Sequence, residues 1–309
     1  MILKRVIAGI AVAIFFSATL ASAYGPLLFA VLVCLTSIAL YEFYSLSAAA
    51  GYRVYKTFGI FCGICWLLCE YLFLPPFASG APQASQFAIW SPVALFAAFF
   101  AIMLRTMFDR NADRAIESGS ITFLGLLYLP VPLSYYIRIA QWDLTTGHAT
   151  TRAAVFLAFF LTIVIKMSDT GAFAVGMSCH KVGRVHPMFP RISPKKSWEG
   201  LAGGTATGVL TGLLLAAMAR QFDWGPDGVF WASSGQPIIG LPGAALISAL
   251  LVIVGVFGDL IESMMKRSAS IKDSASVIPG IGGLLDVVDS LVFGPAVLYF
   301  ALELVSALR

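Results

Sequence analysis

Long apolar runs constrain this chain more than any other feature. A helix needs roughly 20 mainly apolar residues to cross the hydrocarbon core of a bilayer, and about nine such stretches follow one another here. Only 12% of the residues are charged, about half the share of a typical soluble domain. The sequence therefore predicts an all-α, polytopic integral membrane protein. The expected spans are residues 6–23, 27–48, 56–74, 88–107, 119–140, 153–177, 199–218, 238–260 and 287–307.

Basic residues in the connections predict the orientation of these spans. Alternate connections carry lysine or arginine, and those between them have none or have arginines only at their edges. Because cytoplasmic loops are enriched in these residues, we expect a cytoplasmic N-terminus and a C-terminus on the outer side. The basic connections hold Lys4 and Arg5, Arg53 and Lys56, Arg105, Arg110 and Arg114, Lys181 to Lys196, and Lys266, Arg267 and Lys272.

The first apolar run has two interpretations. Lys4 and Arg5, followed by an apolar run that ends at Ala21-Ser22-Ala23, are typical of a secretory signal peptide with its cleavage site. The run is long for a signal peptide, however, and further spans follow at once. We therefore expect a retained first helix.

The chain is expected to form one membrane domain, residues 1–309, with its chemistry in the second half. Residues 1–150 hold few ionisable groups inside their spans, which predicts a mainly scaffolding and lipid-facing role. Residues 151–309 contain two stretches that are rich in charge. Because ionisable residues in or beside a membrane are expensive to bury, such stretches indicate a functional site.

Three features interrupt the apolar pattern of the first half. Glu42 and Glu70 lie near helix ends, where snorkelling to the interface or a helix–helix hydrogen bond explains them about as well as a function. Pro130 and Pro132 predict a kink in the fifth span, because proline removes a helix hydrogen bond.

The first polar stretch, residues 166–204, begins inside a span. Asp169 follows Lys166 by three residues, so the two side chains share a helix face. They would either form an ion pair that neutralises both charges or bind a ligand.

Further along this stretch, Ser193 and Pro194 are typical of a helix start, with serine as the cap and proline at the first position. Lys195 and Lys196 would then lie in the first turn, where the helix dipole disfavours cations. This placement is favourable if an anion binds there. The alternative is that the lysines only mark a cytoplasmic loop.

The second polar stretch, residues 258–290, lies between two apolar runs. Helical spacing places Asp259, Ser263 and Lys266 on one stripe, with Glu262 beside them.

Two more aspartates, Asp286 and Asp289, are three residues apart at the start of the last span. Between the two acidic helix ends, residues 279–283 form a glycine-rich turn that lets backbone approach a ligand closely. Carboxylates from two facing helices suit Mg²⁺, which binds a few carboxylates together with phosphate oxygens. The pattern therefore predicts a metal and polyphosphate site.

At these residues the chain resembles the phosphatidate cytidylyltransferase (CDP-diacylglycerol synthase) family. The upstream family motifs are matched by residues 169–172 and 193–200. The downstream motif is matched by Ser263, Lys266, Arg267, Lys272, Asp273, Pro279, Gly280, Gly282, Gly283, Asp286 and Asp289.

Three positions depart from the family pattern: Ala275 replaces a glycine, Ile281 a histidine and Val287 an arginine. The missing histidine would be serious if it were an obligatory base. A phosphate monoester, however, has a second pKa of about 6 and needs no strong base, so catalysis is still expected.

The resemblance implies that phosphatidic acid attacks the α-phosphorus of CTP to give CDP-diacylglycerol and pyrophosphate. The catalytic residues would be Asp259, Asp286, Lys266 and Asp289, with Asp259, Asp286 and Asp289 as Mg²⁺ ligands and a second cation left open. Binding of CTP or of the lipid phosphate would fall to Ser193, Lys195, Lys196, Ser263, Arg267, Lys272, Asp273, Gly282, Gly283 and Asp169.

The expected partners are CTP, phosphatidic acid and membrane lipids, with a homodimer left open and no nucleic acid. The expected location is the bacterial cytoplasmic (inner) membrane, with the active site on the cytoplasmic side.

Two other functions compete with this interpretation. A CTP-dependent transferase that acts on another lipid phosphate would carry the same polar stretches. A cation-coupled transporter would use Asp169, Lys166, Asp259 and Asp286 as an ion path, but such proteins bind ions near the midplane and often contain a repeat. Here the charges gather at one membrane face and no repeat is visible, which favours the transferase.

Overall fold

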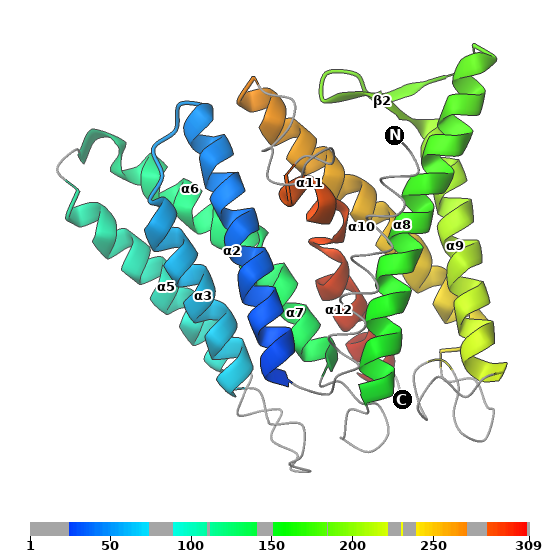
Figure 1. Ribbon diagram of the computed structural model, residues 1–309, viewed down its shortest axis with the longest axis horizontal. Helices are drawn as coiled ribbons and strands as arrows, with labels where there is room; N and C mark the ends of the chain where they lie inside the picture. The colour runs from blue at the N-terminus through cyan, green and yellow to red at the C-terminus, as the bar shows by residue number, and fades with distance from the viewer. Residues whose placement is uncertain are drawn as a thin grey trace. The chain divides into compact units, whose positions relative to one another are not determined.

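The computed structural model describes residues 25–73, 89–109, 112–140, 151–183, 185–221, 230, 239–270 and 283–307. Nearly all regular structure in these residues is helical (Figure 1). Within these described residues, eight helical segments are long and apolar enough to cross a membrane: Pro26–Ala49, Lys56–Phe73, Trp90–Met107, Ala115–Ala140, Val155–Lys181, Trp198–Ala219, Gly240–Ser268 and Leu285–Val305.

The all-α membrane fold is therefore confirmed, and each of these segments overlaps one expected span. The remaining expected span, residues 6–23, lies outside the described residues. The total of nine and the side of the N-terminus stay predictions.

The chain divides into two compact units, and each unit combines segments that are distant in sequence. Of the described residues, the N-terminal unit comprises 25–138 and 265–288, and the C-terminal unit comprises 139–264 and 289–307. The chain changes unit near the end of α10 (Gly240–Ser268) and again between α11 (Leu285–Val288) and the 3₁₀ turn η2 (Asp289–Leu291).

The N-terminal unit packs its helices around a buried tyrosine. Its elements are α2 (Gly25–Ala49), α3 (Lys56–Phe73), α5 (Trp90–Met107), η1 (Ala112–Arg114), α6 (Ala115–Tyr128), most of α7 (Pro130–Ala140), the end of α10, and α11. Tyr44 is fully buried, and its hydroxyl donates to the Thr122 carbonyl at 2.8 Å. Any side chain at Gly59 or Gly125 would collide with its ring. These two glycines therefore let α3 and α6 close on α2.

The fifth span is interrupted where the prolines predict it. Helix α6 ends at Tyr128 and α7 begins at Pro130. Proline has no backbone N–H and its ring clashes with the preceding turn, so an unbroken helix cannot pass through it. The predicted kink is confirmed.

The C-terminal unit contains the longest helices. Its elements are α8 (Thr151–Lys181), β1 (Pro187–Phe189), β2 (Ser193–Ser197), α9 (Trp198–Gln221), most of α10, η2 and α12 (Gly294–Ala307). Helices α8 and α9 lie side by side (Figure 1). A Cβ atom at Gly204 would come within 2.9 Å of the Ser168 carbonyl oxygen, so glycine is what allows the two backbones to approach.

The expected helix start at Ser193 is wrong. Residues 193–197 form strand β2, which pairs antiparallel with β1, and α9 begins only at Trp198. The residue before a proline is driven toward extended backbone, so Pro194 favours a strand at Ser193. The helix cap is Ser197, whose hydroxyl accepts the Gly200 N–H at 3.1 Å. Lys195 and Lys196 therefore lie on a strand, and the argument from the helix dipole does not apply to them.

The last span is also broken, although a continuous helix was expected at 287–307. Helix α11 gives way to η2 at Asp289, and α12 starts at Gly294. Pro295 is tolerated in the first turn of α12 but not in the interior of a helix that began ten residues earlier. Asp289 thus sits in a tight turn, and it does not share a continuous helix with the rest of the span.

Candidate active site

Three carboxylates gather in the C-terminal unit. Asp259 and Glu262 are three residues apart on α10, and Asp289 comes from η2. One oxygen from each can be chosen so that all three lie within 4.8 Å of one another. Glu262 is fully buried and Asp289 is 7% exposed. We call these three residues the carboxylate cluster.

A glycine brings the two sides of the carboxylate cluster together. A Cβ atom at Gly258 would collide with the backbone carbonyl of Asp289. The absence of a side chain therefore lets η2 approach α10 directly at the residue before Asp259.

The chemistry of the carboxylate cluster suits a cation. Carboxylates at this separation repel one another, so they are stable together only if one of them takes up a proton or a positive charge lies among them. Oxygen-only ligand sets of this kind are what hard divalent ions such as Mg²⁺ bind. The residues present therefore fit the metal that the sequence predicts.

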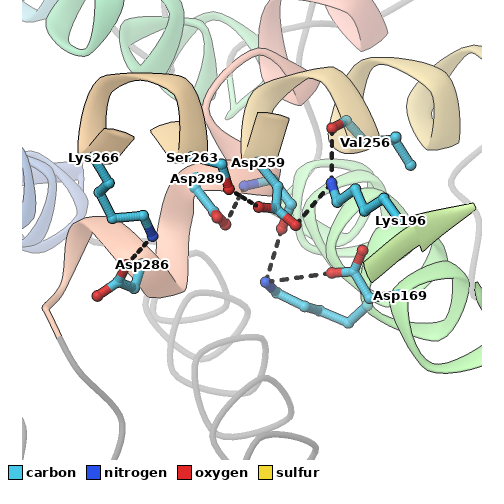
Figure 2. Close-up of polar contacts among 10 residues, drawn as sticks. Asp169, Lys196, Val256, Asp259, Ser263, Lys266, Asp286 and Asp289 are labelled. Atoms are coloured by element: carbon cyan, nitrogen blue, oxygen red, sulfur yellow. Dashed lines mark hydrogen bonds and ion pairs between the residues drawn. The ribbon is translucent and has the colours of Figure 1, made fainter. Parts of the chain in front are cut away.

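Two lysines reach the same region from two other elements. Lys196 Nζ on β2 lies 2.8 Å from Asp259 Oδ2 and donates to the Val256 carbonyl at 3.1 Å (Figure 2). Lys166 Nζ on α8 donates to Ser290 Oγ at 2.9 Å. The two polar stretches of the sequence thus meet within one unit.

Asp169 and Ser263 complete the surroundings of the carboxylate cluster. The Lys166 Nζ to Asp169 Oδ2 distance is 3.9 Å, longer than the hydrogen bond from Lys166 to Ser290. Lys166 is therefore not engaged in a simple ion pair with Asp169 alone. Ser263 Oγ donates to Asp259 Oδ1 at 3.3 Å (Figure 2).

A second polar group lies in the N-terminal unit. Lys266 Nζ donates to Asp286 Oδ1 at 2.6 Å (Figure 2). Asp286 Oδ2 accepts the Gly283 N–H at 2.9 Å. Asp286 was expected to bind Mg²⁺ with Asp259; among the described residues it contacts a lysine and a backbone amide of its own unit. Its role as a ligand stays a prediction.

The remaining candidate residues lie on the surface or outside the described residues. Lys195 is exposed on β2, Ser193 is half-buried on the same strand, and Arg267 is exposed at the end of α10. Lys272, Asp273 and Gly282 lie outside the described residues, as do Ala275 and Ile281.

Glu262 is the residue that sequence reasoning left out of the site. Its spacing of one helical turn from Asp259 was the available signal. Spacing alone could not show that its side chain is buried beside Asp289, because that depends on the approach of η2.

The fold and site define a class: a polytopic membrane protein in which acidic and basic side chains from several elements gather within one unit. The family model described as "Cytidylyltransferase family" matches residues 3–305. This chain belongs to the cytidylyltransferase family.

Several bacterial relatives are named phosphatidate cytidylyltransferase. The Bacillus subtilis protein is 32% identical over 244 residues, which cover 79% of each chain. The Synechocystis protein is 33% identical over 63% of this chain and 66% of its own. The Haemophilus influenzae protein is 36% identical over 44% of this chain and 42% of its own.

Proposed function

We propose that this chain condenses CTP with phosphatidic acid to give CDP-diacylglycerol and pyrophosphate. A phosphate oxygen of the lipid attacks the α-phosphorus of CTP, the bond from that phosphorus to the bridging oxygen breaks, and pyrophosphate leaves. The names of the relatives supply the lipid substrate. Membership of a cytidylyltransferase family disfavours the transporter considered above.

The observation that carries the proposal is the carboxylate cluster with Lys196 beside it. A divalent cation bound by Asp259, Glu262 and Asp289 would neutralise phosphate charge and hold the reacting groups in line. Positioning and charge neutralisation supply most of the rate in this type of transfer.

The lysines have separate tasks in this proposal. Lys196 holds Asp259 now and is free to turn one of its three donors to a phosphate oxygen. Lys166, which is hydrogen-bonded to Ser290, would bring a second positive charge to the phosphate groups. Both lysines are part-buried, so their charges act with less screening than surface charges.

The site is proposed to face the cytoplasm of a bacterium, from its inner membrane. Support comes from the connection between α8 and α9, which carries basic residues, as cytoplasmic loops do. CTP would arrive from the cytoplasm, and the lipid from the bilayer.

Pyrophosphate release by detergent-purified protein tests the proposal. Release should need CTP, phosphatidic acid and Mg²⁺ together, and CDP-diacylglycerol should form in equal amount by mass spectrometry. Asp259→Asn should abolish both, whereas Glu70→Gln, which lies in the N-terminal unit, should retain them.

Folded protein that releases pyrophosphate with another lipid phosphate but not with phosphatidic acid would replace the substrate assignment. Folded protein inactive with a panel of lipid phosphates would refute the transferase function.

A further inference from the structure

A buried acid from the N-terminal half contacts the backbone just before Asp286. Glu42, in the C-terminal third of the apolar helix α2, is 1% exposed. Its Oε1 accepts the Leu284 N–H at 3.0 Å and its Oε2 accepts the Leu285 N–H at 2.7 Å. Snorkelling to the interface, one of the expected explanations, is therefore wrong for this residue.

These contacts occupy the start of α11. The Leu284 carbonyl accepts the first bonds of the helix, from the amides of Val287 and Val288. The amides of Leu284 and Leu285 thus have no partner inside the helix. A carboxylate there makes charge-assisted hydrogen bonds and is favoured by the helix dipole.

Two carboxylates together fix three consecutive amides. Asp286 Oδ2 accepts the Gly283 N–H, and Glu42 accepts the next two. The backbone that carries Asp286 is therefore held from both sides, and the Asp286 side chain is directed to Lys266 at 2.6 Å.

We infer that Glu42 is a positioning residue for the reaction. It anchors the segment 283–286 so that Asp286 and Lys266 keep one geometry during turnover. The inference rests on the proposed function together with the catalytic roles that the family resemblance implies for Asp286 and Lys266. It assigns a task to a helix for which the sequence predicts a scaffolding role.

Glutamine is the sharpest substitution at this site. It has the size of glutamate, but its amide offers one acceptor oxygen and one NH₂ donor group. One of the two backbone N–H groups would then face a donor. Glu70→Gln is the matched control, because Glu70 is a second buried glutamate of the same unit, 3% exposed and bound to Arg138.

Hydrogen–deuterium exchange reports the contact without reference to activity. Peptides that cover residues 283–288 should exchange about tenfold faster in Glu42→Gln than in wild type, because exchange follows local opening. The same peptides should be unchanged in Glu70→Gln. Unchanged exchange in Glu42→Gln would overturn the anchoring itself.

Kinetics separate positioning from simple stabilisation. Loss of a group that orients a reacting residue typically costs about 10–100-fold. We expect a fall of that size in kcat for Glu42→Gln at saturating CTP, with KM for CTP within about threefold of wild type. Faster exchange together with a kcat equal to that of Glu70→Gln would leave Glu42 a structural cap and overturn the inference.

Failure of the proposed function and failure of the Glu42→Gln variant to fold can both be distinguished from failure of the inference. Inactive wild-type protein would refute the proposed function, whereas the exchange result would still test the contact. If Glu42→Gln does not fold, Glu42→Asp keeps the charge but is one methylene too short to reach both amides. It should show the same two effects, and wild-type behaviour in it would overturn the inference.

Discussion

Glu70 in the N-terminal unit and the carboxylate cluster in the C-terminal unit are stabilised in opposite ways. In the N-terminal unit, Glu70 is bound by Arg138 through two parallel bonds, from Nε at 2.9 Å and from Nη2 at 3.0 Å. Ser91 Oγ donates to the same carboxylate at 2.7 Å. The charges cancel, and the three side chains join α3, α5 and α7.

The carboxylate cluster of the C-terminal unit gathers like charges instead. Asp259, Glu262 and Asp289 place oxygens within 4.8 Å of one another, and Lys196 contacts Asp259 from one side. A bidentate arginine pair is a structural solution for a buried acid. Clustered carboxylates cost stability unless a ligand supplies positive charge. We call the Glu70–Arg138 pair the clamp. The difference in charge distinguishes this structural pair from a site that binds a cation.

Removal of one clustered charge should have the largest effect. Asp289→Asn is expected to lower kcat by about 10³-fold, because it removes a preorganised charge at the reacting centre. Without Mg²⁺ its melting temperature should equal or exceed that of wild type, since repulsion within the cluster is relieved. Addition of Mg²⁺ should raise the melting temperature of wild type only.

Pyrophosphate release and thermal unfolding in detergent, each with and without Mg²⁺, measure both effects. An Asp289→Asn protein that keeps a tenth of the activity would show that the cluster is not the catalytic metal site.

Glu262→Gln should have the next largest effect. The amide keeps one acceptor oxygen, so the site is weakened rather than removed. We expect turnover to fall about 10–100-fold and the Mg²⁺ concentration for half-maximal rate to rise. A Mg²⁺ titration of pyrophosphate release measures this, with Glu70→Gln as the matched buried glutamate. An unshifted titration would remove Glu262 from the ligand set.

Glu262 also marks the limit of sequence reasoning about the site. Hydropathy could predict the spans, because each one is a local run whose burial in lipid needs no tertiary information. Whether Glu262 belongs to the carboxylate cluster depends instead on the approach of η2 to α10 at Gly258. No local pattern states which side chains meet across such an approach.

The paired strands β1 and β2 show a different limit of prediction from sequence. Two serines four residues apart, Ser193 and Ser197, each offer a cap for the same helix. The proline after Ser193 favours the first site by local rules. In the structure, Ser193 belongs to strand β2, which pairs with β1, and the helix is capped by Ser197. The pairing of β2 with β1 therefore overrides the local signal for a helix start at Ser193.

The strand also separates two adjacent lysines. Lys196 is half-buried and contacts Asp259, whereas Lys195 is exposed. Neighbouring residues of a strand point to opposite faces, so the two alanine variants should differ. We expect about a tenfold loss of kcat/KM for Lys196→Ala, the cost of one charge-assisted contact, and a smaller loss for Lys195→Ala.

Pyrophosphate release as a function of CTP and lipid concentration compares the two variants. Equal losses would contradict the division of roles, and no loss in either would reduce the segment to a marker of topology.

The smallest effect on turnover should come from the clamp. Arg138→Met leaves Glu70 buried without its bidentate partner and should lower the free energy of unfolding by about 3 kcal/mol, the low end for such pairs. The low end applies because the Arg138 side chain is 21% exposed. The folded fraction should keep kcat within about twofold, since nothing that binds substrate has changed.

Replacing both partners tests the reason for this loss. In Glu70→Gln/Arg138→Met no buried charge is left uncompensated, so part of the lost stability should return. Thermal unfolding and kcat per folded protein check both claims when they are measured side by side for Arg138→Met, Glu70→Gln and the double variant. A 100-fold fall in kcat with stability intact would mean that the clamp acts on the chemistry. The distinction between a paired acid that holds helices and clustered acids that hold a ligand would then fail for this molecule.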